Sequence, residues 1–265
     1  MSKKKVVKGN CYICNEYGKL TFEHIPPKSV FNDKLVKVYQ GDSYAKLISD
    51  KNRYPWEKDG IKYKSQQRGM GGYTLCERCN NITGKFYGEE YKKWVYTILS
   101  FINKNRLEFE NSNNATVTLK GTYPGRFIRQ VLSMICSTYP GFTEQNLFVK
   151  EMLLNRDFVY KDVPPFKIYM YLLKNPYLGY TSLAGLILKK WKLKFVDEVD
   201  VYPFGFILSL SAEEKEMDIT KFMNLGYNDK ADIELIMNTH EKNNHIPLDF
   251  RSKAEIIEAS SKQKN

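Results

Sequence analysis

The sequence has no apolar run of about 18 residues, the length that a membrane-crossing helix needs. Its first residues, Met-Ser-Lys-Lys-Lys, lack the apolar stretch of a secretory signal, so we expect a cytoplasmic protein with no membrane partner. Disulfide-rich and collagen-like classes are excluded, because 265 residues hold only 5 cysteines, 16 glycines and 10 prolines. What remains is a globular composition, with 42% hydrophobic and 27% charged residues.

Positive charge is concentrated in the N-terminal third. Residues 1–98 hold 19 Lys and Arg against 10 Asp and Glu, whereas residues 99–265 hold 22 against 20. A basic segment of this kind attracts phosphate backbones, which would make nucleic acid a partner. The alternative is a solvated surface that serves only solubility, and charge alone leaves both open.

Four of the five cysteines form two Cys-x-x-Cys pairs, Cys11 with Cys14 and Cys76 with Cys79. In a reducing compartment such pairs rarely form disulfides, and two of them can supply four thiolates to one tetrahedral zinc. The alternatives are two unrelated pairs of buried thiols, or a redox role. We predict a structural Zn²⁺ site. Cys136 lies in an apolar helical pattern and is expected in the core.

The segments beside the cysteine pairs predict the order strand, long loop, strand, helix. Leu20–Phe22 is typical of a short strand, which Pro26 and Pro27 would end. A second short strand is expected at Tyr73–Leu75, after a Gly-Gly turn. Apolar residues then recur at steps of three and four up to Ile102, the pattern of an amphipathic helix.

Together these motifs resemble a known nuclease family. The first Cys-x-x-Cys is followed by Glu23-His24-x-x-Pro27, and the second runs directly into Asn80-Asn81. This combination is similar to the zinc-stapled HNH endonucleases of the ββα-metal (His-Me finger) superfamily, in particular to the subgroup with four zinc-binding cysteines beside the catalytic motif. The resemblance covers about residues 8–98 and implies a ββα-metal nuclease module there.

The resemblance implies a metal-dependent endonuclease that hydrolyses phosphodiester bonds in DNA. His24 would be the catalytic general base, while Glu23 and Asn80 would hold a catalytic Mg²⁺ or Mn²⁺ through oxygen atoms. The alternatives are a structural loop histidine at position 24 and a helix N-cap at position 80.

The chain also departs from the family pattern. The family usually has Asp at the position of Glu23, its final helix His is absent, and its middle Asn has no clear counterpart. A backbone carbonyl could orient His24 instead, since an imidazole N–H needs only an acceptor.

Residues 30–72 form an unusually long connection in which cations alternate with aromatic residues. Such loops are usually functional or disordered, and this composition suits phosphate contact and base stacking. We predict that Lys62, Lys64 and Arg68, which lie closest to the second strand, bind nucleic acid. The alternative is a surface insertion whose aromatic residues pack on the core.

The predicted fold class is α+β, with the nuclease module at residues 1–98 and a mixed α/β accessory domain of unknown role at residues 99–265. The accessory domain could select substrate, form a homodimer or dock a protein partner. Its strands are expected at residues 115–119, 166–172, 194–202 and 204–210. Its helices are expected at residues 126–138 and 143–154, with Thr143 as an N-cap.

Two functions therefore remain open from the sequence. The first is a metal-dependent DNA endonuclease, and the resemblance is compatible with a role in phage defence or in a mobile element. The second is a non-catalytic zinc-binding module that contacts nucleic acid or protein. The two differ at Glu23, His24 and Asn80, because a pure binding module has no use for a carboxylate beside an imidazole at that place.

Overall fold

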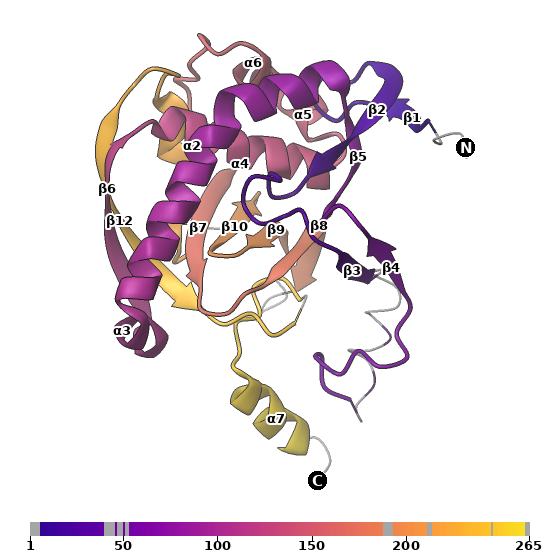
Figure 1. Ribbon diagram of the computed structural model, residues 1–265, viewed down its shortest axis with the longest axis vertical. Helices are drawn as coiled ribbons and strands as arrows, with labels where there is room; N and C mark the ends of the chain where they lie inside the picture. The colour runs from indigo at the N-terminus through magenta and orange to yellow at the C-terminus, as the bar shows by residue number, and fades with distance from the viewer. Residues whose placement is uncertain are drawn as a thin grey trace.

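The computed structural model describes residues 6–39, 46, 50, 53–187, 193–210, 214–244 and 246–262. These residues form a mixed arrangement of helices and sheets, as expected: a three-stranded sheet, a two-stranded hairpin and a seven-stranded sheet (Figure 1). Within these ranges, none of the helices combines the length and the apolar character that crossing a bilayer requires.

The three-stranded sheet holds the residues that the sequence analysis singled out. Its antiparallel strands are β1 (Lys8–Asn10), β2 (Tyr17–His24) and β5 (Gly71–Cys76), in the order β1-β2-β5. Phe22 pairs with Tyr73 and its neighbour Thr21 pairs with Leu75, so Thr74 is an extra residue in β5. This bulge leaves the carbonyl of Thr74 to accept a hydrogen bond from the N–H of Tyr12 at 2.9 Å.

Helix α2 (Glu77–Lys104) follows β5 with no intervening loop and packs against both β2 and β5. Its buried face recurs at steps of three and four, as predicted, and includes Tyr87, Tyr91, Trp94 and Ile98. The helix crosses the domain boundary predicted after residue 98. The division into two domains stays a prediction, but a continuous cluster of buried apolar side chains runs from Cys11 to Met237.

The seven-stranded sheet has the order β6-β12-β7-β10-β9-β8, with the short β11 also paired to β7. Helix α4 (Pro124–Thr138) is almost wholly buried between α2 and this sheet (Figure 1). The strands are β6 (Asn114–Thr122), β7 (Lys167–Leu173), β8 (Leu178–Ile187), β9 (Leu193–Val201), β10 (Phe204–Ser209), β11 (Met217–Asp218) and β12 (Ala231–His240).

Most of the predicted elements of the C-terminal part are confirmed, namely β6, β7, β9, β10 and α4. The single helix predicted over residues 143–154 is wrong. The chain forms α5 (Phe142–Gln145) and α6 (Leu147–Leu154), because Asn146 adopts a non-helical conformation between them. Thr143 is not an N-cap either, since Gly141 precedes α5 and the Thr143 hydroxyl donates a hydrogen bond to the carbonyl of Tyr12 at 2.9 Å.

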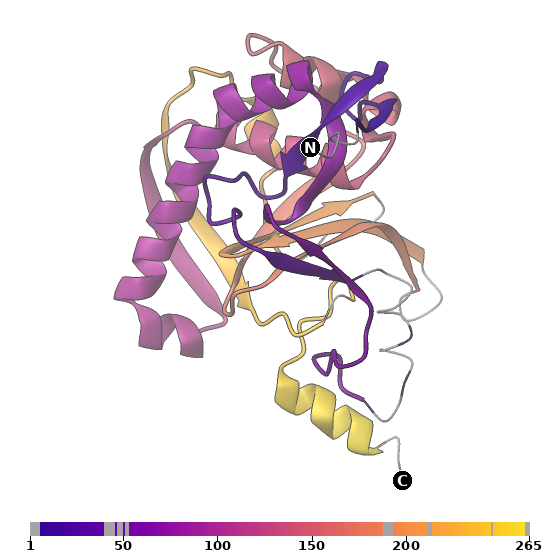
Figure 2. The ribbon, with the colours of Figure 1, turned by 45° about the vertical axis from the view of Figure 1, so that its right-hand side comes forward.

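The long connection between β2 and β5 carries a hairpin of its own, β3 (Val36–Tyr39) and β4 (Tyr63–Gln66). Figure 2 shows this hairpin extending along one side of the molecule toward the C-terminal helix α7 (Lys253–Lys262). The ammonium of Lys253 lies 5.5 Å from the ring centre of Trp56, so the hairpin connection and α7 are in contact. The remaining helices are α3 (Arg106–Asn111) and the 3₁₀ turn η2 (Thr220–Asn224).

Candidate metal centre and nucleic-acid groove

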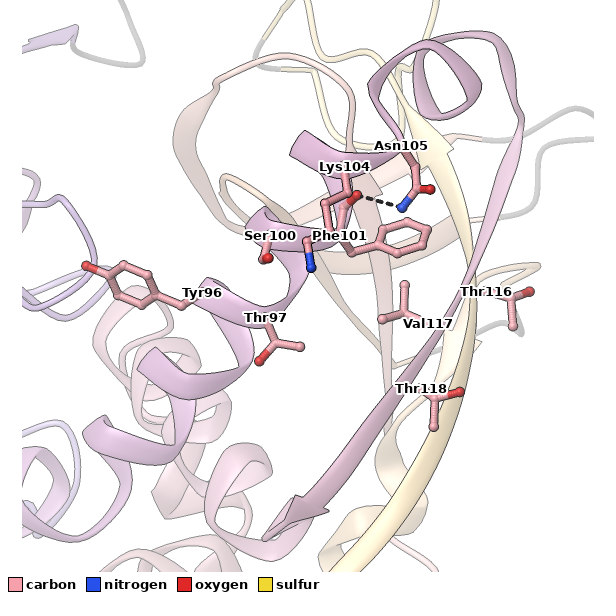
Figure 3. Close-up of a pocket in the computed structure, with 9 residues that line it drawn as sticks. All are labelled: Tyr96, Thr97, Ser100, Phe101, Lys104, Asn105, Thr116, Val117 and Thr118. Carbon is pink, nitrogen blue, oxygen red and sulfur yellow. Dashed lines mark hydrogen bonds between the residues drawn. The ribbon is translucent and has the colours of Figure 1, made fainter.

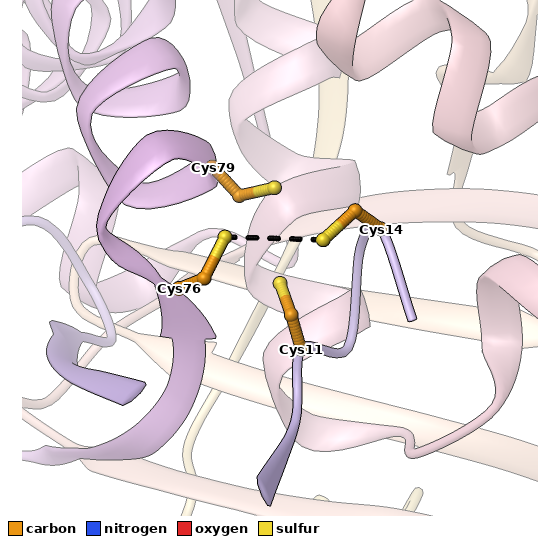
Figure 4. Close-up of side chains that lie close together, drawn as sticks. All are labelled: Cys11, Cys14, Cys76 and Cys79. Atoms are coloured by element: carbon orange, nitrogen blue, oxygen red, sulfur yellow. Dashed lines mark hydrogen bonds between the residues drawn. The ribbon is translucent and has the colours of Figure 1, made fainter. Parts of the chain in front are cut away.

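The four predicted zinc ligands converge on one point (Figure 4). The sulfur atoms of Cys11, Cys14, Cys76 and Cys79 all lie within 4.8 Å of one another, and those of Cys14 and Cys76 are 3.8 Å apart. Sulfur atoms about 2.3 Å from a tetrahedral zinc would be separated by about 3.8 Å. The arrangement is therefore compatible with a zinc site, and all four thiols are free of disulfides.

Two different local structures present these sulfur atoms. Cys11 and Cys14 lie on a turn closed by a hydrogen bond from the N–H of Asn15 to the carbonyl of Cys11 at 2.8 Å. Asn15 has a φ of 65°, a left-handed conformation that Asn tolerates better than most residues. On the other side, Cys76 is the N-cap of α2 and Cys79 lies in its first turn.

The electrostatics at this cluster favour at least one thiolate. A hydrogen bond with the Cys79 thiol, together with backbone N–H groups, lowers the pKa of Cys11 to about 4 although burial opposes the shift. Burial raises the pKa of Cys14 to about 11. The N-terminus of α2 adds positive potential at the same point. Since zinc binds thiolates, these four cysteines, three buried and one partly buried, form a donor set that fits the ion.

The turn that carries the first cysteine pair is also hydrogen-bonded to the C-terminal part of the chain. The Lys150 ammonium of α6 donates a hydrogen bond to the carbonyl of Cys14 at 3.2 Å, and Thr143 of α5 holds the carbonyl of Tyr12. Cys136 is fully buried in α4 and is not among the four converging cysteines, as predicted. A metal here would therefore join three regions of the sequence.

Glu23 is the penultimate residue of β2, and its side chain is buried, with 7% of the residue exposed. Burial raises the pKa of its carboxyl group to about 8. Among the described residues, no hydrogen bond or ion pair to this carboxylate is found. With this pKa the group is a neutral carboxylic acid near pH 7, and a bound cation would favour its ionised form.

His24 ends β2 and is half-buried. Desolvation lowers the pKa of its imidazole, while a hydrogen bond to the backbone of Arg68 acts in the opposite direction. Its ring meets the edge of Phe22 at a centroid distance of 5.0 Å. The backbone group that acts on the imidazole belongs to Arg68 and not to the neighbourhood of Gly72.

Asn80 lies in the first turn of α2 and is not the N-cap, a position that Cys76 occupies. Its side-chain nitrogen donates hydrogen bonds to the Thr21 hydroxyl at 3.0 Å and to the Phe22 carbonyl at 3.2 Å. These contacts bring Asn80 to the strand that carries Glu23 and His24. The amide oxygen has no hydrogen bond among the described residues and is the atom available to a cation.

The structure adds one buried residue that the sequence analysis missed. Asn32 donates hydrogen bonds to the carbonyls of Pro26 and Met70, at 2.6 and 2.8 Å, and accepts one from the N–H of Met70 at 2.6 Å. It therefore fixes the loop after His24 to the start of β5. The only sequence signal is an Asn in a long connection, which is too common to single out.

A surface groove with a volume of about 740 Å³ runs beside β2, β4 and β5. Two of the three predicted nucleic-acid contacts, Lys64 and Arg68, line it, whereas Lys62 does not. Phe22 and Arg68 belong to this groove and also contact His24, through its ring and through a backbone hydrogen bond. The predicted general base thus borders the groove.

A second hollow, of about 590 Å³, lies between the C-terminal half of α2 and strand β6 (Figure 3). Its walls hold the ring of Tyr96 and several hydroxyl groups, and Lys104 is the ionisable side chain apart from that phenol. None of the predicted site residues lines it. We therefore place the candidate site at β2, β5 and the start of α2.

Comparison of the chain with protein-family models, with curated proteins and with solved structures gives no match, so the site is interpreted from its own geometry.

Proposed function

We propose that the protein is a metal-dependent endonuclease that hydrolyses phosphodiester bonds in DNA, with its catalytic site on β2, β5 and the start of α2. The observation that carries the proposal is the surroundings of Glu23. A buried carboxyl group without a described partner directly precedes a half-buried histidine in the sequence, on the strand that the Asn80 amide reaches. A structural or purely binding role accounts poorly for that carboxylate, because an apolar residue would be more stable there.

The chain supplies oxygen atoms of the kind that Mg²⁺ and Mn²⁺ prefer. Glu23 and Asn80 would hold the ion, and water molecules and the substrate phosphate would complete its shell. When bound, the ion supplies positive charge to the scissile phosphate and to the leaving 3′ oxygen. The four cysteines would hold a structural zinc that keeps β5 and α2 in place and does no chemistry.

His24 is assigned the proton transfer. Its lowered pKa keeps the imidazole neutral near pH 7, and the hydrogen bond to the Arg68 backbone holds one ring nitrogen. The other nitrogen can then take a proton from water as the water oxygen bonds to phosphorus. The bond from phosphorus to the 3′ oxygen breaks, and the departing 3′ oxygen takes a proton from solvent. The products are a 5′-phosphate and a 3′-hydroxyl.

The direct test is cleavage of supercoiled, linear and branched DNA, and of RNA, with Mg²⁺ or Mn²⁺ and with an EDTA control. His24→Ala should lower the rate by a factor of about 10² to 10⁴, since it removes the general base. Zinc content and the unfolding temperature should stay at the parental values, because His24 is half-buried and outside the zinc cluster.

A matched histidine variant separates chemistry from folding. His240 lies on β12 beside Glu216, far along the chain from the site, so His240→Asn should cut at the parental rate. If His24→Ala cuts as fast as the parent, the base assignment is wrong. If the parent cuts no substrate with either metal, the protein is a zinc-binding module without catalysis.

A further inference from the structure

The groove beside β2 and β5 has an unusual balance of charge. Three cations line it, Lys19 of β2, Lys64 of β4 and Arg68, and no carboxylate does so among the described residues. A groove of one sign concentrates ligands of the opposite sign, and a polyphosphate backbone is the ligand that repeats its charge along a line.

The same groove exposes aromatic rings. Tyr73 of β5 lines it with 45% of the residue exposed, and its ring makes a T-shaped contact with the ring of Phe22 at a centroid distance of 5.6 Å. Edge contact with Phe22 fixes the orientation of Tyr73 while much of its ring stays in contact with solvent. An exposed, oriented ring between cations is a platform for a flat partner that carries negative charge.

We infer that this groove binds an unpaired segment of single-stranded DNA, with a base stacked on Tyr73 and phosphates at Lys64 and Arg68. The inference rests on the proposed function for DNA as the substrate and goes beyond it by naming the state of the strand. Base faces are buried in the stack of a duplex, so a ring such as Tyr73 can engage them only where the strand is unpaired.

The lining side chains do not distinguish DNA from RNA, so the choice of DNA rests on the proposed function. Thr21 donates to the carbonyl of Leu75, and the amide nitrogen of Gln66 donates to the carbonyl of Gly71. Gln66 Oε1 has no hydrogen-bond partner among the described residues, and Gln67 also lines the groove. Stacking and phosphate contact provide the affinity, and neither requires a 2′-hydroxyl.

The groove also leads to the proposed base. Phe22 lines the groove and contacts the ring of His24, and Arg68 contributes its side chain to the groove and its backbone to the imidazole. A strand bound along the groove would pass within reach of the end of β2. Binding of an unpaired segment would thus place a phosphodiester next to His24.

The test is fluorescence anisotropy with a labelled single-stranded DNA, the duplex of the same sequence and the matching RNA, in buffer without Mg²⁺, Mn²⁺ or chelator. The single-stranded DNA should bind more tightly than the duplex, and the matching RNA should bind close to the single-stranded DNA, because stacking and phosphate contact do not require a 2′-hydroxyl. Tyr73→Ala should weaken single-strand binding about tenfold, whereas Tyr73→Phe should stay near the parent, since stacking needs only the ring. Tyr96→Ala is the matched control, because Tyr96 is also 45% exposed but lies outside this groove.

The contribution of Lys64 and Arg68 is measured separately, through the salt dependence of the affinity. Lys64→Ala and Arg68→Ala should each reduce the slope of log affinity against log salt by about 0.7, the value for one phosphate contact on a single strand. Lys161, an exposed lysine that does not line the groove, provides the control Lys161→Ala, which should leave the slope unchanged. Zinc content and unfolding temperature of each variant exclude misfolding as the cause.

The inference is overturned if the duplex binds as tightly as the single strand, or if Tyr73→Ala binds like Tyr96→Ala. It fails independently of the proposed function. Tight, Tyr73-dependent binding without any cleavage would support the groove and refute the nuclease. Cleavage of duplex DNA at a rate that Tyr73→Ala leaves unchanged would support the nuclease and refute the groove.

Discussion

Asn32 shows how much one side chain can fix near the proposed site. It is buried, and both atoms of its amide are used: the nitrogen donates to the carbonyls of Pro26 and Met70, and the oxygen accepts from the Met70 N–H. Gly69 belongs to the same contact, because a Cβ at its φ of +84° would overlap the backbone of Asn32. The loop after His24 is thereby held to the start of β5.

At residue scale we predict that Asn32→Ala destabilises the protein by about 2–3 kcal/mol, because it leaves the Pro26 carbonyl and the Met70 N–H without their partner. The Met70 carbonyl keeps its hydrogen bond from the N–H of Ile25. Asn32→Asp should destabilise the protein more than Asn32→Ala at neutral pH, since a carboxylate would face two carbonyl oxygens. Urea unfolding measures both. The control Asn111→Ala removes one exposed hydrogen bond to the Leu107 carbonyl and should change stability by less than about 0.5 kcal/mol. Equal stability of the Asn32 and Asn111 variants would refute the assigned role.

The residues predicted from the sequence differ from Asn32 in one physical respect. The cysteines could be predicted because zinc ligation imposes a short spacing within each pair, and the structure brings all four together. Asn32 and the Met70 backbone are 38 residues apart, and no local spacing encodes such a contact. The same holds for the Arg68 backbone at His24, which depends on the path of an inserted hairpin.

At the scale of elements, the segment that follows β12 is pinned to the far face of the large sheet by one buried ammonium. The Lys242 Nζ donates to Glu198 Oε2 at 2.7 Å and to the carbonyl of Ile246 at 3.0 Å, and lies 3.7 Å from Asp200 Oδ2. The Tyr171 hydroxyl donates to Asp200 at 2.5 Å. This single cation therefore serves two carboxylates of β9 and holds the chain segment that leads to α7.

We predict that Lys242→Met destabilises the protein by about 3–5 kcal/mol at neutral pH, because it leaves two buried carboxylates without a cation. Burial and the charge of Glu198 raise the pKa of Asp200 from 3.8 to about 7. An acid with a higher pKa in the folded state stabilises the fold while it is protonated, and that stability is lost as the pH rises toward the folded value. Urea unfolding between pH 4 and pH 7 should therefore show that the variant loses the least unfolding free energy, relative to the parent, near pH 4.

An exposed ion pair provides the contrast for this prediction. Arg106 and Glu110 of α3 form a solvent-exposed pair at 2.8 Å, and Arg106→Met should change stability little at any pH. If Lys242→Met changes stability at pH 7 as little as Arg106→Met does, Lys242 does not hold the segment after β12 to the sheet. Limited proteolysis provides a second measure, since cleavage after residue 240 should accelerate only in the Lys242 variant.

The predicted elements were those whose pattern is regular over a long stretch. Helix α2 could be predicted because its apolar residues recur through 28 residues. Residues 143–154 have similar apolar spacing, but the Thr143 hydroxyl bonds to the Tyr12 carbonyl and the chain breaks at Asn146, so tertiary contact overrides the local pattern. Strand β12 was missed because its alternation is incomplete: Ile233 and Leu235 flank the polar Glu234, but the exposed residue between Leu235 and Met237 is the apolar Ile236.

For the whole molecule, the cysteine cluster is the point where the N-terminal sheet, α2 and the α5–α6 region meet. Thr143 and Lys150 hold the turn of the first cysteine pair, and the second pair starts α2, whose far end packs in the core. A zinc ion at this place would stabilise the groove, the proposed catalytic strand and the start of α2 together. Removal of the zinc should therefore destabilise the whole fold and not only one local contact.

At the scale of the whole molecule we predict that Cys76→Ser loses zinc and lowers the unfolding temperature by more than about 10 °C, because four-thiolate zinc contributes directly to folding energy. Metal analysis of the purified protein and thermal unfolding measure the two effects. Cys136→Ala is the matched control: this cysteine is buried in α4 outside the cluster, so the variant should keep one zinc per chain. Full zinc content in Cys76→Ser would show that the four sulfur atoms do not form the metal site, and would remove the support for the position of β5 and α2.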